Sequence, residues 1–299
     1  MSNRSTAPWV NYRAMVTRLI RATLVGGCLA LAVLGSPVQA QPKSGEPLRR
    51  TIEFEGSERE YFVRLPPDFD SGKTYWPLVV VHGGGGNGKS YWLATGIREV
   101  ASERGLDAIV ITPSFSNTDN QSSQFPALGE GRFLLRVLED VRQGYQLRPK
   151  ILLAGYSRGG QFTHRFTFSN PELITAVASF ASGTWTTPDG KLLIESFGEV
   201  PRPDAFLIAP GNRALVVERL SGIFSPRVAG VAGLAPKPGA VDIPFLVMCG
   251  SLDPRYEIAR QFAQALEKAG YRVESEWPRT PHGSKTAAEF QAEFKKYPR

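Results

Sequence analysis

Apolar, β-branched runs that alternate with amphipathic segments are the feature that most limits how this chain can fold. Buried strands are predicted at 77–82, 108–115, 150–157, 174–183 and 244–250, with a last strand at 272–278. Helical spacing between them predicts helices at 90–105, 133–145, 159–168, 256–270 and 285–297. Strands that alternate with helices predict an α/β fold, with a mostly parallel sheet covered by helices on both faces.

A hairpin is expected before this alternation begins. Residues 50–56 and 59–66 alternate apolar with polar side chains and flank Gly56-Ser57. The alternation fails at 184–241, where prolines and glycines gather. We interpret that stretch as an insertion over the carboxyl edge of the sheet, either a lid or pocket wall or a peripheral excursion. Trp185 and Trp92 are candidate substrate-binding residues, with simple packing as the alternative.

The N-terminal forty residues have the layout of a secretory signal peptide. Four arginines and no acid precede the apolar run 22–35, which ends in small residues before Gln41. We therefore expect residues 1–40 to be removed, leaving a catalytic domain at 41–299 that is secreted or periplasmic. A lipoprotein signal is the alternative, because the sequence Leu24-Val25-Gly26-Gly27 directly precedes Cys28.

Charge and cysteine content narrow the possible partners of the mature chain. Loss of residues 1–40 removes four arginines, so the net charge falls from +7 to +3. No polybasic block remains, so neither nucleic acid nor, after cleavage, a membrane is an expected partner. Cys249 is then the one cysteine, which excludes an internal disulfide and predicts a buried thiol. The oligomeric state cannot be predicted.

The stretch Gly83–Ser90 fits two motifs. GGGGNGKS matches the phosphate-binding loop of nucleotide hydrolases. The same letters begin with His82 and three glycines, a turn that builds an oxyanion hole in acyl-transfer enzymes. A nucleotide hydrolase also needs a magnesium-binding aspartate at another strand end, and the predicted strands supply none. We therefore favour the oxyanion loop.

A second motif, Gly155-Tyr156-Ser157-Arg158-Gly159, lies between a predicted strand and a predicted helix. That context favours a sharp turn with an exposed Ser157 hydroxyl, where the Arg158 amide faces a developing oxyanion.

A nucleophilic serine needs a base, and an acid to orient that base. Of the three histidines, His282 follows the last predicted strand, as a base in such a sheet would. Asp253, after the strand 244–250, is the expected acid, with Asp189 as its competitor.

With these motifs the chain resembles the α/β-hydrolase superfamily, and within it the secreted polyhydroxybutyrate-depolymerase and feruloyl-esterase-type serine esterases. The resemblance implies Ser157 as nucleophile, His282 as base and Asp253 as orienting acid. It also implies oxyanion donors at the Arg158 amide and at Gly84, where four consecutive glycines leave Gly85 open as the second donor.

The sequence therefore predicts a secreted serine hydrolase that cleaves carboxylic esters through an acyl-enzyme, on small-molecule or polymer substrates. It implies no metal and no organic cofactor. A peptidase of the prolyl-oligopeptidase type and an inactive hydrolase fold used for binding are the alternatives. Feruloyl, acetyl-sugar, hydroxyalkanoate and lipid esters all stay open.

Overall fold

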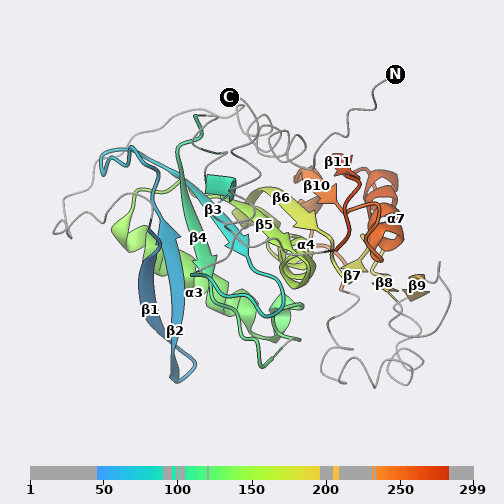
Figure 1. Ribbon diagram of the computed structural model, residues 1–299, viewed down its shortest axis with the longest axis horizontal. Helices are drawn as coiled ribbons and strands as arrows, with labels where there is room; N and C mark the ends of the chain where they lie inside the picture. The colour runs from blue at the N-terminus through green and yellow to red at the C-terminus, as the bar shows by residue number, and fades with distance from the viewer. Residues whose placement is uncertain are drawn as a thin grey trace.

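The structure is a computed structural model, and two β-sheets account for its strands (Figure 1). It describes residues 46–89, 96–98, 101, 105–119, 121–195, 205–208, 231 and 234–282. The predicted signal peptide, Trp92, the predicted helix at 285–297 and most of the predicted insertion lie outside the described residues.

Eight strands form the main sheet, in the order β1-β2-β4-β3-β5-β6-β10-β11. Their bounds are β1 Leu48–Phe54, β2 Ser57–Arg64, β3 Trp76–Val81, β4 Ala108–Pro113, β5 Ile151–Tyr156, β6 Ile174–Phe180, β10 Phe245–Met248 and β11 Val273–Glu276. The hairpin β1–β2 joins β4 antiparallel, and the other neighbouring strands run parallel. This sheet confirms the predicted α/β fold and the predicted hairpin.

The two faces of the sheet bury alternate side chains of the same strand. In β3, Val79 and Val81 face the helices α3 Glu130–Gly144, α4 Arg158–Ser169 and α7 Tyr256–Lys268. Leu78 and Val80 face the other way, where Ile97 and Ala101 pack against them. A strand covered on both sides must be apolar at every position, which explains the unbroken run of valines.

The predicted insertion begins with regular structure that the sequence did not predict. β7 Thr184–Thr186, β8 Leu192–Glu195 and β9 Ala205–Ile208 form a three-stranded antiparallel sheet. β7 contacts α4 and α7, and β8 contacts α7. Figure 1 shows this small sheet beside α7, at the opposite end of the molecule from β1 and β2.

Trp185 belongs to the core, so the prediction that it is a substrate-binding residue is wrong. Its side chain is 0% exposed and stacks on Phe262 with 4.4 Å between ring centroids. The His164 ring lies 5.1 Å away on α4. β7 folds back against both helices, which leaves the indole no surface to offer a substrate.

No helix in the described ranges is both long and apolar enough to cross a membrane.

Replacing Trp185 by alanine should destabilise the fold. Loss of a buried aromatic ring leaves a cavity between α4 and α7, so the free energy of unfolding should fall by about 3–5 kcal/mol. Urea unfolding measures this change. Trp185→Phe is the matched control: it keeps a ring on Phe262 and should cost less than half as much. Equal stability of the wild type and Trp185→Ala would contradict the core assignment.

Candidate active site

The carboxyl ends of the parallel strands bring the predicted site residues to one edge of the sheet. Strand register pairs Val81 with Gly155, Tyr156 with Phe180 and Phe180 with Met248. Met248 in turn pairs with Glu276 on β11. Because these ends are level, the loops that carry the glycines, Ser157, Asp253 and His282 all leave the sheet at the same edge.

Ser157 stands on a strained turn between β5 and α4. Its φ is 56° and its ψ is −117°, a backbone conformation rarely adopted by residues other than glycine. Its amide donates to the Phe180 carbonyl at 2.8 Å, and its carbonyl accepts the first helical hydrogen bond from Gln161. The turn therefore presents the serine at the edge of the sheet rather than within the helix.

Close backbone contacts explain the glycines on either side of the serine. A Cβ on Gly159 would lie 2.2 Å from the Val81 carbonyl oxygen, and one on Gly155 would lie 2.5 Å from the Gly159 carbonyl oxygen. Both distances exclude a side chain. The first turn of α4 thus packs directly on the ends of β3 and β5.

Asp253 and His282 form a direct pair. His282 Nδ1 lies 2.6 Å from Asp253 Oδ2, and the carboxylate is 1% exposed while the imidazole is 25% exposed. The other oxygen, Oδ1, accepts the amide of Arg255 at 2.9 Å and lies 3.6 Å from its guanidinium. Burial alone would raise the pKa of Asp253, but these hydrogen bonds and charges bring it below the usual value. The carboxylate is therefore held ionised against the ring.

Asp189 lies elsewhere. It pairs with Lys191 at 2.7 Å and accepts the Thr187 hydroxyl, and its side chain is 55% exposed. The structure thus brings Asp253, rather than Asp189, to the imidazole.

Tyr156 is the site residue that sequence reasoning missed. Its ring stacks on the His282 ring with centroids 5.2 Å apart and an angle of 23°, and its hydroxyl lies 3.4 Å from Nδ1. It immediately precedes Ser157, so the imidazole stacks on the side chain of the residue next to the predicted nucleophile. Its place directly before Ser157 in the motif could have pointed to it, but the motif allows any residue type at that position.

The glycine loop lies beside the serine. A Cβ on Gly83 would be 3.5 Å from Ser157 Cβ and 3.3 Å from the Tyr156 carbonyl oxygen. At Gly84 and Gly85 an added Cβ would meet nothing within 4 Å, so the loop turns to open space just beyond Gly83. Gly83, which precedes the predicted donor Gly84, and Arg158 therefore adjoin Ser157 from two different chain segments.

This loop does not have the arrangement of a phosphate cradle. Such a cradle points several amide N–H groups at the ligand. Here the amides of Gly86, Gly88 and Lys89 donate to Gly83 O, Ser114 Oγ and Asn87 Oδ1. The loop therefore matches the nucleotide-binding motif in sequence but not in the direction of its backbone amides.

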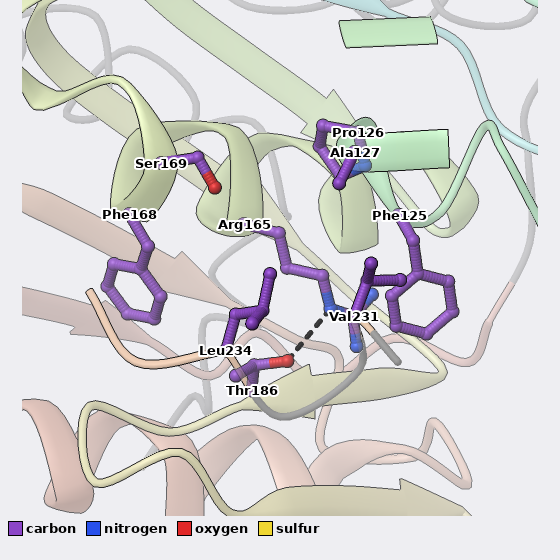
Figure 2. Close-up of a pocket in the computed structure, with 9 residues that line it drawn as sticks. All are labelled: Phe125, Pro126, Ala127, Arg165, Phe168, Ser169, Thr186, Val231 and Leu234. Atoms are coloured by element: carbon purple, nitrogen blue, oxygen red, sulfur yellow. Dashed lines mark hydrogen bonds between the residues drawn. The ribbon is translucent and has the colours of Figure 1, made fainter. Parts of the chain in front are cut away.

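A pocket beside α4 is lined by other residues (Figure 2). Figure 2 shows Arg165 reaching from α4 toward Thr186, and the two are hydrogen-bonded. The centre of the Arg165 guanidinium lies 4.1 Å from the centroid of the Phe125 ring. Arg165 also donates to the Gln124 carbonyl and to Thr184. It thus ties the nucleophile helix to β7 and to the 121–128 turn. Neither Ser157, Asp253 nor His282 lines this pocket.

Among the described residues, no group of three histidine, cysteine or acidic side chains could hold a metal ion. Cys249 is buried, as expected.

A family model of the alpha/beta hydrolase family matches residues 78–291. The chain belongs to that family. Comparison with curated proteins finds no match.

Solved structures share the fold at low identity. A ferulic acid esterase is 16% identical with a TM-score of 0.57, covering 84% of this chain and 95% of its own. The S-formylglutathione hydrolase of Staphylococcus aureus is 18% identical with a TM-score of 0.53, covering 84% and 96%. The acylaminoacyl peptidase of Pyrococcus horikoshii is 16% identical with a TM-score of 0.56, covering 85% of this chain and 41% of its own.

Two buried neutral histidines make the stability of this hydrolase fold depend on pH. Burial lowers the pKa of His82 to about 4 and holds that of His164 well below its usual value. The unfolded chain, whose histidines titrate near ~6.5, therefore binds more protons than the folded chain below that pH. The stabilisation is complete above about pH 6.5 and is lost as the pH falls toward 4.

We expect the free energy of unfolding to be lower at pH 5 than at pH 7.5, by about 2 kcal/mol from His82 alone. Urea titrations at the two pH values measure the difference in free energy of unfolding. The variant His82→Gln should show a smaller difference. Equal free energies of unfolding at both pH values would contradict this expectation.

Proposed function

We propose that the protein is a secreted serine hydrolase that cleaves carboxylic esters through an acyl-enzyme. The observation that carries this proposal is the carboxylate-held imidazole of His282, which lies over the residue next to the strained Ser157. Nucleophile, base and orienting acid from three separate loops at one sheet edge are what acyl transfer requires.

The chemistry proceeds in two halves. Ser157 Oγ attacks the ester carbonyl while His282 takes the hydroxyl proton, and a tetrahedral oxyanion forms. Amides of Arg158 and Gly84 stabilise that oxyanion. Collapse breaks the C–O bond, and the imidazolium gives its proton to the leaving alcohol. Water, deprotonated by His282, then attacks the acyl-enzyme and releases the acid and free Ser157.

Asp253 orients the base and does not contact the substrate. Its Oδ2 accepts a hydrogen bond from the Nδ1–H group of His282, which leaves Nε2 as the nitrogen that receives a proton from the serine. Its ionised state, supported by Arg255, stabilises the imidazolium as it forms.

The ester class is the finer part of the proposal. The resemblance in sequence to feruloyl-esterase-type enzymes and the fold similarity to a ferulic acid esterase support aromatic esters as the first substrates to test. Acetylated sugars, hydroxyalkanoate oligomers and simple lipids follow. Peptides test the alternative of an oligopeptidase.

Ser157→Ala should leave a folded protein with turnover of p-nitrophenyl esters at least about a thousandfold lower. A fluorophosphonate probe should label the wild type and not the variant. Retained turnover, or probe attached elsewhere, would remove the proposed nucleophile. Cleavage of a peptide panel without cleavage of esters would favour the peptidase instead.

Two aspartates provide the matched control. Asp253→Asn should cut turnover by about a thousandfold or more, because the amide favours the wrong imidazole tautomer. Asp189→Asn, on the exposed β7–β8 turn, should change turnover by less than about twofold. The reverse ranking would overturn the assignment of the acid.

Export is part of the same proposal. We expect cleavage between Ala40 and Gln41 on secretion, because the residues before that bond fit a signal peptide. The intact mass of protein from the medium or periplasm measures the new N-terminus. A diacylated chain that begins at Cys28 would instead identify a lipoprotein.

A further inference from the structure

The carbonyl oxygen of Gly83 is held by three donors. His82 Nδ1 lies 2.8 Å from it, the Gly86 amide 3.2 Å and Arg158 Nη2 3.4 Å. His82 Nε2 accepts the Phe115 amide at 2.9 Å, so the proton of this neutral ring is on Nδ1 and points at Gly83.

Fixing that oxygen also fixes a donor beside the nucleophile. The peptide bond between Gly83 and Gly84 is trans and planar, so its N–H points opposite to its C=O. Gly83 lies against Ser157, as the 3.5 Å approach of its Cβ position shows. The partners of the Gly83 oxygen therefore decide where the Gly84 N–H points. This favours Gly84 over Gly85 as the second oxyanion donor.

Asn117 completes the contact between Arg158 and the loop. The Arg158 guanidinium donates to Asn117 Oδ1, and Asn117 Nδ2 donates to the Gly86 carbonyl at 2.9 Å. The two side chains thus hold both ends of the turn that runs from Gly83 to Gly86. Arg158 is 5% exposed, so its guanidinium acts here in a largely water-free setting.

We infer that the side chains of Arg158 and Asn117 are positioning residues for the oxyanion hole. The backbone of Arg158 supplies one donor, and its guanidinium, with Asn117, orients the peptide that supplies the other. Neither side chain contacts the reacting atoms, so both act through the Gly84 amide. The inference rests on the proposed function, because an oxyanion has to form at Ser157.

Arg158→Met tests the inference, since it keeps the amide and the apolar length but removes the guanidinium. Loss of an oxyanion donor costs about 10²–10³ in kcat, and a donor that is misplaced rather than lost should cost about 10–100-fold. KM should change by less than about threefold, because the donor acts mainly in the transition state. Arg158→Lys should recover part of kcat.

Asn117→Ala gives a second variant on an exposed loop that does not threaten folding. We expect about a tenfold lower kcat. The double variant should be no worse than Arg158→Met alone, because both side chains orient one peptide. Arg136→Met is the control, since that arginine lies on the exposed face of α3 and pairs with Glu139.

The Ki of a trifluoromethyl ketone inhibitor separates a positioning role from a purely structural one, because it would not change if the side chains only stabilised the fold. The adduct of this ketone with a serine carries an oxyanion, so its Ki should rise in proportion to the loss of kcat, at an unchanged melting temperature. Wild-type kcat and Ki in Arg158→Met and Asn117→Ala would overturn the inference while Ser157→Ala stays inactive. Activity retained in Ser157→Ala would overturn the proposed function and the inference together.

Discussion

The contact between the first turn of α4 and the end of β3 is the constraint on which the site depends. At Gly159 the helix backbone comes so close to the Val81 carbonyl that no Cβ fits between them. The helix starts at this contact directly after Ser157, whose backbone has the strained φ of 56°. The contact also brings Gly159, the residue after Arg158, against the carbonyls of Val81 and His82 where the glycine loop begins. One backbone contact therefore lies next to both the proposed nucleophile Ser157 and the proposed oxyanion donor Arg158.

Contacts between α4 and the neighbouring strands, rather than interactions within the turn itself, offset the conformational strain at Ser157. Gly160 packs against the Phe180 carbonyl, and Thr163 shares a hydrogen bond with Ser179 of β6. Farther along α4, Arg165 ties the helix to β7 through Thr184 and Thr186. The buried polar groups on this helix thus bind it to β6 and β7, and they keep a geometry that would otherwise relax.

Local patterns predicted the parts of the molecule that local chemistry determines. The β-branched runs gave the central strands, since an element buried on two faces has to be apolar throughout. Ser157, Asp253 and His282 could be chosen because each follows a strand end. By contrast, β7 to β9 were missed, because three short strands among prolines and glycines have no clear period. Trp185 was placed wrongly since its environment is made by α4 and α7, which no local window contains. Tyr156, Arg158 and Asn117 depend on the same kind of long-range contact.

The ends of the main sheet have a consequence for how copies of this protein meet. β11 has four residues, of which Glu274 is exposed, and β1 at the other end carries Arg49, Arg50 and Glu53. An incoming strand of another copy would have to approach these charges along a short or half-solvated edge. Short strands and charged side chains at the ends of a sheet disfavour the addition of further strands, so these ends work against the joining of this sheet to that of another copy.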